Sequence, residues 1–290
     1  MSNPYGTPYS GVVVPMITPF TPAGAIDEAA IGRIVDHLVG FRVTGIFPLG
    51  TTGESMSIHP EERRRVVAAT AKHTADRAML YAGIASTCFR ESVEAAKAYE
   101  QLGVKAVVAH VPSYYPLVDD EIEAYFLRLA DAVRLPLVLY NIPVTTHHSI
   151  PIDAVDRLRK HPNIVAIKDS SGDKPRLAEM LQRFGGRGGF PVLVGSSPAF
   201  SHGLRHGAIG LVPSGAHLVG DKYQQQFEAA MAERWDEVER LQAETDAAVT
   251  PYLKGRTMGQ GLAALKAIME KRGLCGRTML PPLRDHVGDV

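Results

Sequence analysis

The run Ile164-Val165-Ala166-Ile167 ends at Lys168 and is followed by Asp169-Ser170-Ser171-Gly172-Asp173. A short, continuous apolar run is typical of a strand that is buried on both faces, as in a parallel sheet. A lysine at the end of such a strand has to reach solvent, find a partner or take part in chemistry. Because burial disfavours the charged ammonium, a buried lysine offers a nucleophilic amine. Lys168 is therefore the first candidate for a reactive residue.

Similar apolar runs recur along the chain and predict its fold. They occupy residues 11–15, 45–49, 79–84, 106–110, 137–140, 164–168, 192–195 and 209–212. The segments between them have helical periodicity, as in residues 27–41. Eight strand–helix units in about 215 residues predict an α/β fold, a (β/α)8 TIM barrel, over residues 8–219. A doubly wound open sheet is the alternative, but no GxGxxG motif follows the first strand.

The strand-like runs stop after about Gly220. Residues 221–234, 236–249 and 258–272 have helical patterns instead. We therefore expect residues 220–290 to form a C-terminal three-helix extension of the barrel.

The composition excludes several classes of protein. The 290 residues carry no net formal charge, and 45% are hydrophobic, which is ordinary for a globular protein. No basic stripe predicts nucleic acid binding, and neither a membrane-spanning run nor a secretory signal is present. Cys88 and Cys275 lie far apart without a CxxC pair, so we expect reduced thiols in a cytoplasmic protein. His202 and His206 are four residues apart without a third ligand in register, so we expect no metal site.

Polar residues gather where the predicted strands end, which is the edge of a TIM barrel that carries the active site. Tyr140 and Lys168 end adjacent strands, so we expect them side by side. A tyrosine phenol next to a cation can move the protons needed to remove water from a carbinolamine. The glycine-flanked Thr51 and Thr52 offer backbone N–H groups to a carboxylate. These residues predict an enzyme that forms an imine with a 2-oxo acid.

Three motifs resemble those of one superfamily. They are Gly50-Thr51-Thr52-Gly53-Glu54, Tyr140-Asn141-Ile142-Pro143 and Ile167-Lys168-Asp169, in this order and spacing. They are similar to motifs of the class I pyruvate aldolase superfamily, which contains dihydrodipicolinate synthase and N-acetylneuraminate lyase, and the resemblance covers nearly the whole chain. It implies that Lys168 forms a Schiff base with pyruvate or the 2-oxo end of a substrate and that Tyr140 moves protons.

The same resemblance implies roles for other residues. Thr51 would link Tyr140 to Tyr114, which in relatives reaches in from a neighbouring subunit. The Thr51 and Thr52 amides would hold the pyruvate carboxylate, and Val212 would line the pyruvate pocket. The implied partners are a small 2-oxo acid and an aldehyde, with no cofactor beyond the covalent imine. Relatives are commonly homotetramers, so we expect a dimer of dimers.

Departures from the motifs bear on which branch of the superfamily the chain resembles. Dihydrodipicolinate synthases carry an arginine two residues after the NxP motif, where this chain has Thr145. Loss of such a carboxylate partner should cost about 2–5 kcal/mol. We therefore expect a lyase closer to the 2-keto-3-deoxy acid and 4-hydroxy-2-oxoglutarate aldolases, in which Thr145, Ser170 and Ser196 would bind the distal part of the substrate. The synthase reaction and a dehydratase that uses the same imine are the alternatives.

A barrel that keeps its pocket as a small-molecule sensor is a hypothesis of another class, because a fold alone does not prove turnover. The set Thr51, Tyr114, Tyr140 and Lys168 is complete in this sequence, which argues against a degenerate site.

Overall fold

The computed structural model describes residues 6–186, 188–288 and 290. Within them, eight parallel strands close into a barrel in the order β1 to β8, which confirms the predicted (β/α)8 fold. The strands are β1 (Gly11–Pro15), β2 (Gly45–Phe47), β3 (Met79–Gly83), β4 (Ala106–Ala109), β5 (Leu137–Asn141), β6 (Ile164–Asp169), β7 (Val192–Val194) and β8 (Gly210–Leu211).

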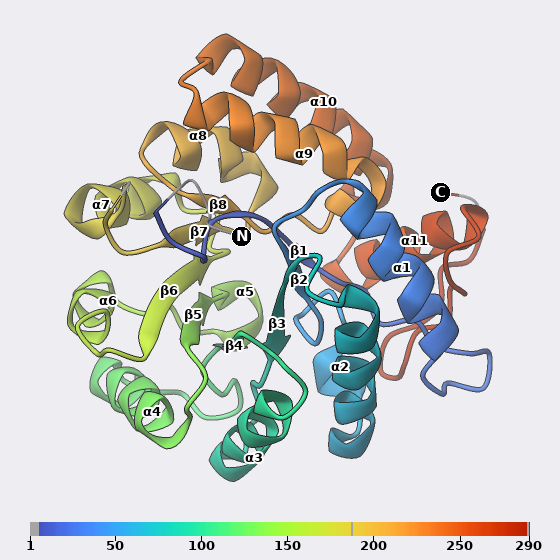
Figure 1. The fold of residues 1–290 in the computed structure, drawn as a ribbon, viewed down its shortest axis with the longest axis horizontal. Helices are drawn as coiled ribbons and strands as arrows, with labels where there is room; N and C mark the ends of the chain where they lie inside the picture. Colours follow the sequence, from blue (N-terminus) through green and yellow to red (C-terminus); the bar gives the residue numbers. More distant parts are fainter. Residues whose placement is uncertain (1–5, 187, 289) are drawn as a thin grey trace.

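Helices surround the barrel, as Figure 1 shows. They are α1 (Glu28–Gly40), α2 (Pro60–Thr74), α3 (Phe89–Glu100), α4 (Asp119–Ala132), α5 (Pro143–Thr146), α6 (Ile152–Leu158), α7 (Lys174–Phe184), α8 (Phe200–Arg205), α9 (Ala216–Met231), α10 (Trp235–Leu253) and α11 (Met258–Lys271), with 3₁₀ turns η1 (Ser55–Ser57) and η2 (Ser197–Ala199). The three predicted C-terminal helices are present as α9, α10 and α11. Among the described residues, no helix is long and apolar enough to cross a membrane.

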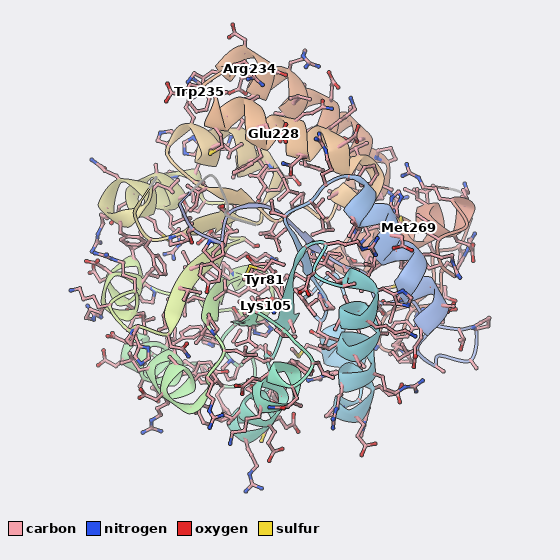
Figure 2. All side chains as sticks on the ribbon, viewed as in Figure 1. Tyr81, Lys105, Glu228, Arg234, Trp235 and Met269 are labelled. Atoms are coloured by element: carbon pink, nitrogen blue, oxygen red, sulfur yellow. The ribbon has the colours of Figure 1, made fainter. Side chains whose placement is uncertain are left out.

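The continuous apolar runs are explained by burial on both sides of the sheet. The side chains that fill the barrel are those of Val13, Phe47, Tyr81, Ala106, Val108, Val138, Tyr140, Ile142, Ala166, Leu193 and Val212. Tyr81 lies at the middle of the barrel in Figure 2. A second and larger apolar layer separates the strands from the helices.

Several strands end earlier than the apolar runs predict. Strand β2 ends at Phe47, and the next residues turn away because Leu49 has a left-handed backbone with φ of 60°. A left-handed residue cannot continue a strand, and for leucine this conformation is strained. The apolar run therefore continues into a buried loop, which periodicity alone does not distinguish from a strand.

His217, near the start of α9, joins the segments that follow the first and last strands of the barrel. Its Nε2 accepts a hydrogen bond from the Ile17 N–H at 3.2 Å, and its Nδ1 donates to the Ser214 carbonyl oxygen at 2.7 Å. This pattern requires a neutral imidazole. Burial lowers the pKa of His217 to about 4, and the neighbouring His37 adds to this effect.

We predict that this histidine makes the fold sensitive to mild acid. The unfolded chain binds the His217 proton near pH 6.5, whereas the folded protein binds it only near pH 4. The stabilisation is therefore complete above pH 6.5 and is lost as the pH falls towards 4, by about 3 kcal/mol in the free energy of unfolding. His110, whose pKa burial also lowers, contributes with the same sign.

Urea unfolding between pH 7 and pH 4 measures this dependence. His217→Gln should be less stable than the wild type at pH 7 and should lose less stability across the interval. A variant with the same pH slope as the wild type would contradict the assignment.

Candidate active site

Lys168 and Tyr140 lie side by side at the carboxyl end of the barrel, as predicted, because they are register partners on β6 and β5. The Lys168 Nζ is 3.9 Å from the centroid of the Tyr140 ring and 5.2 Å from that of Phe47. Only 5% of Lys168 is exposed. Aromatic faces attract an ammonium, yet they bind it less firmly than a carboxylate does. The amine is thus held inside the barrel by groups that leave it free to react.

The loop after β2 brings a hydroxyl to the tyrosine. The Thr51 Oγ1 lies 3.4 Å from the Tyr140 hydroxyl oxygen, and Thr52 is buried next to it. Two residues with left-handed backbones, Leu49 and Glu54, bracket this loop. The Thr18 hydroxyl donates a hydrogen bond to the Gly53 carbonyl oxygen at 2.7 Å. Such strained backbone persists only where the surroundings hold it, and it is common at functional sites.

Gly195, which follows β7, leaves room for the Ser170 hydroxyl and the Lys168 side chain. A Cβ at this position would lie 2.0 Å from the Ser170 Oγ and 2.9 Å from the Lys168 Cε. The Ser196 hydroxyl is close to Gly172, and although Ser196 precedes η2, its side chain makes no capping bond. The structure therefore places both predicted serines on the loops beside Lys168.

Val212 follows β8 and lines a small void inside the barrel together with Lys168, Phe47 and Leu193. Val212 thus shares a void with the Lys168 side chain, and its role in a pyruvate pocket stays a prediction.

The structure does not bring Tyr114 to Thr51 within this chain. Tyr114 lies in the loop between β4 and α4, is 78% exposed and packs its ring against Tyr115. A role for Tyr114 at the site therefore requires a second subunit, and that role stays a prediction.

A cavity of about 370 Å³ opens at the carboxyl end of the barrel. The residues that line it are Thr51, Glu54, Ser55, Met56, Ser57, His110, Ser113, Thr145, Met258, Gly259, Leu262, Pro282 and Leu283. The predicted distal residue Thr145 is among them, and its hydroxyl donates to the Ile142 carbonyl oxygen at 3.2 Å. His148, in the loop after α5, is not among the lining residues; its Nε2 donates to the Tyr115 carbonyl oxygen at 3.0 Å.

Sequence reasoning missed His110, which follows β4. Its ring centroid is 6.0 Å from that of Tyr140, and its Nδ1 donates to the Val111 carbonyl oxygen at 2.8 Å. Burial lowers the pKa of His110, and the charge of Lys168 adds to this effect, so the imidazole is neutral. His110 could have been identified from the sequence, because it lies at the carboxyl end of a predicted strand, where active-site residues of a TIM barrel are found.

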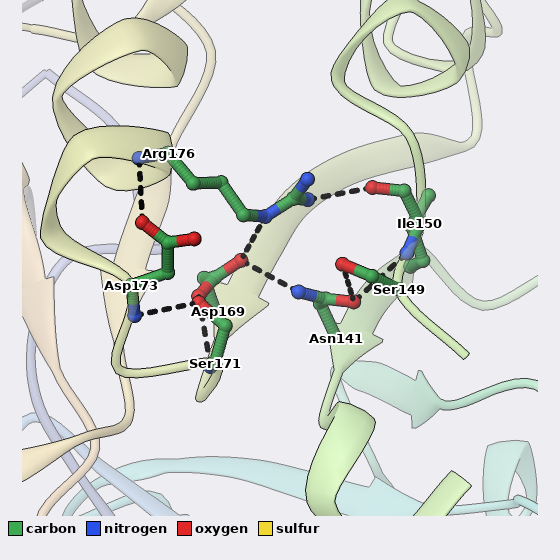
Figure 3. A network of polar contacts seen from close by, with 7 residues as sticks. All are labelled: Asn141, Ser149, Ile150, Asp169, Ser171, Asp173 and Arg176. Atoms are coloured by element: carbon green, nitrogen blue, oxygen red, sulfur yellow. Dashed lines mark hydrogen bonds and ion pairs between the residues drawn. The ribbon is translucent and has the colours of Figure 1, made fainter. Parts of the chain in front are cut away.

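A network outside the barrel fixes the two strands that carry Lys168 and Tyr140, as Figure 3 shows. The next residues on these strands, Asp169 and Asn141, are also register partners and point outwards. The Asn141 amide donates to Asp169 Oδ2 at 2.8 Å, and Arg176 Nε donates to the same oxygen at 3.2 Å. Arg176 also donates to the Ile150 carbonyl oxygen at 2.6 Å. Because side chains alternate along a strand, this network sets the register of the inward-facing pair.

Comparisons with known proteins agree with this geometry. Residues 8–287 match the family described as the dihydrodipicolinate synthetase family. The chain belongs to this family. It is thus a lyase of the pyruvate-dependent aldolase type.

Similar curated proteins include several 4-hydroxy-tetrahydrodipicolinate synthases. The 4-hydroxy-tetrahydrodipicolinate synthase of Leuconostoc mesenteroides is 34% identical over 237 residues, 81% of each chain. These relatives do not favour the 2-keto-3-deoxy acid branch that the sequence motifs suggest.

Solved structures share the fold. The dihydrodipicolinate synthase of Bacteroides thetaiotaomicron has a TM-score of 0.88 and 28% identity, over 96% of this chain and 94% of that one. YagE of E. coli K12, solved in complex with pyruvate, has a TM-score of 0.88 and 23% identity, over 95% of this chain and 93% of that one.

We predict that Gly195→Ala displaces the reactive amine. The added Cβ would overlap the Ser170 hydroxyl and press on the Lys168 side chain, so turnover should fall at least tenfold. Gly40→Ala is the matched control, because a Cβ at Gly40, the last residue of α1, meets nothing within 4 Å. Steady-state kinetics with both variants test this prediction. Equal activity in the two variants would show that the Ser170 and Lys168 side chains do not require a glycine at position 195.

We predict that Asp169→Ala destabilises the fold by about 3–5 kcal/mol, because it leaves the largely buried Arg176 without its carboxylate. Asp131→Ala removes a highly exposed partner of His161 and should have little effect. Thermal or urea unfolding compares the two variants. A similar loss of unfolding free energy in the two variants would mean that the Asp169 network does not stabilise the fold more than an exposed ion pair does.

Proposed function

We propose that the protein forms or cleaves a carbon–carbon bond between pyruvate and an aldehyde through an imine on Lys168. The observation that carries the proposal is the buried Lys168 amine beside Tyr140, whose hydroxyl contacts Thr51. Membership of the dihydrodipicolinate synthetase family and the pyruvate complex of the fold relative YagE also support it.

The geometry suggests a role for each group. The neutral Lys168 amine attacks the 2-oxo carbon of pyruvate, and the carbinolamine that forms loses water as Tyr140 delivers a proton to the leaving hydroxyl. The Tyr140 phenolate then takes a proton from the pyruvate methyl group, which converts the iminium to an enamine. The enamine attacks the aldehyde carbon, and Tyr140 returns the proton to the oxygen of the new alkoxide. Water finally hydrolyses the imine and restores the lysine. In the cleavage direction the same steps run in reverse.

The pyruvate carboxylate needs a partner during these steps. The backbone N–H groups of Thr51 and Thr52, in the strained loop after β2, fit that purpose. Val212, which lines the same void as Lys168, supplies an apolar wall for the pyruvate pocket. The sequence motifs imply the same roles for Thr51, Thr52 and Val212.

Two candidate substrate classes follow from different observations. The Thr145 and Ser113 side chains at the cavity suit a hydroxylated distal group, as in 2-keto-3-deoxy acids and 4-hydroxy-2-oxoglutarate. The named relatives instead support the 4-hydroxy-tetrahydrodipicolinate synthase reaction of pyruvate with aspartate semialdehyde. Thr145, which stands where synthases carry an arginine, argues against the second class. A dehydratase reaction would proceed through the same Lys168 imine and remains the third alternative.

We further propose that the protein is a homotetramer acting in the cytoplasm. Tyr114, Tyr115 and Val118 expose large apolar side chains on the loop between β4 and α4, where a second copy would cover them. Cys88 and Cys275 are both free thiols, which suits a reducing compartment.

A substrate comparison tests the choice between classes. Pyruvate release from 2-keto-3-deoxy acids and 4-hydroxy-2-oxoglutarate is measured beside condensation of pyruvate with aspartate semialdehyde. We expect the larger kcat/KM in the first group. A kcat/KM for aspartate semialdehyde that exceeds the others by an order of magnitude would instead establish the synthase reaction.

Substitution of the lysine tests the shared chemistry. Lys168→Ala should lower turnover of every substrate by at least about three orders of magnitude, as loss of a catalytic nucleophile generally does. Lys105→Ala, at an exposed lysine just before β4 (Figure 2), should leave turnover unchanged. Retained turnover in Lys168→Ala would remove the imine mechanism.

A further inference from the structure

A buried ion pair joins the loop after β2 to the last helix of the chain. Glu54 ends the Gly50–Glu54 loop, and its carboxylate contacts the Lys266 Nζ from the middle of α11. The two side chains are 0% and 1% exposed, respectively. They are 212 residues apart in sequence, so the contact is made only by the folded C-terminal extension.

The remaining polar atoms of the pair are also bound by the C-terminal segment. The second carboxylate oxygen of Glu54 accepts from the Leu280 N–H at 3.0 Å, and Lys266 Nζ donates to the Thr278 carbonyl oxygen at 2.8 Å. The ammonium also lies 4.2 Å from the Phe20 ring centroid. Phe20 follows the segment that contains Thr18, whose hydroxyl binds Gly53. The end of the loop is therefore held from two directions.

Such a pair is unfavourable unless it is completely satisfied, because removing two charges from water costs several kcal/mol per ion. Burial lowers the pKa of Lys266, and the Glu54 carboxylate opposes that shift. The contact is made at a residue with φ of 53°, a left-handed backbone that a glutamate adopts only when it is held there. The pair thus fixes the left-handed residue that ends the loop, three positions after Thr51.

We propose that Glu54 and Lys266 are positioning residues through which the C-terminal extension sets the pyruvate-binding loop. The pair does not touch the reacting atoms. It holds Glu54, which holds the Thr51 and Thr52 amides in the orientation that binds a carboxylate and keeps the Thr51 hydroxyl at Tyr140. This inference rests on the proposed imine chemistry and adds to it the role of the extension.

The same extension also lines the cavity. Met258 and Leu262 of α11, together with Leu283 of the segment that follows, line it along with Thr51 and Thr145. The barrel and the extension therefore build one site, and displacement of α11 would alter both the loop and the cavity lining.

The test uses full-length variants and pyruvate as the probe. Lys266→Met removes one charge, and Glu54→Gln with Lys266→Met removes both, so that the double variant contains no unpaired buried charge and should recover stability. Lys222→Met is the matched control, because Lys222 pairs with Glu244 between α9 and α10, at a distance from the loop. Circular dichroism confirms folding, and borohydride reduction followed by intact mass measures the imine as a function of pyruvate concentration.

We expect the pyruvate concentration for half-maximal trapping to rise at least tenfold in Lys266→Met and to stay raised in the double variant after its stability recovers. Lys222→Met should match the wild type. A folded variant that traps at the wild-type concentration would overturn the positioning role, and if Lys266→Met does not fold, the double variant decides. Absence of trapping in the wild type would instead contradict the proposed function itself.

Discussion

The parallel register between β5 and β6 is the constraint on which the site depends. It places Lys168 opposite Tyr140 inside the barrel and, one residue later, Asp169 opposite Asn141 outside it. A slip of one residue would turn the lysine out of the barrel, since side chains alternate along a strand. Asn141 and Arg176 both donate hydrogen bonds to Asp169 on the outer side of the sheet. These bonds fix the register that places Lys168 and Tyr140 inside the barrel.

The chemistry then follows from what surrounds the amine. Aromatic rings and Val212 shield Lys168 from water, and the loop after β2 brings the Thr51 hydroxyl to Tyr140. That loop is strained at both ends and is held by Thr18 on one side and by the Glu54–Lys266 pair on the other. The C-terminal helices, which the sequence presents as an addition to the barrel, therefore take part in the architecture of the site.

The fold could be predicted because its main signal is local: continuous apolar runs mark the parallel strands, and the barrel places Tyr140 and Lys168 together. Other features depend on distant contacts and have no local pattern. Leu49 belongs to an apolar run, yet its left-handed backbone ends β2 and makes the loop. The partner of Glu54 lies more than two hundred residues away, and Tyr114 is exposed in the single chain. The substrate class depends on side chains at the cavity, such as Thr145. A sequence does not show which substrate groups these side chains bind.

The most direct measurement is borohydride reduction of the protein with pyruvate, followed by peptide mapping of the adduct. We predict a lactyl-sized adduct on Lys168, which is absent when pyruvate or borohydride is omitted. An adduct on another lysine would mean that the reactive amine is not the one beside Tyr140. No adduct at all, in folded protein that turns over its substrate, would contradict imine chemistry at this site.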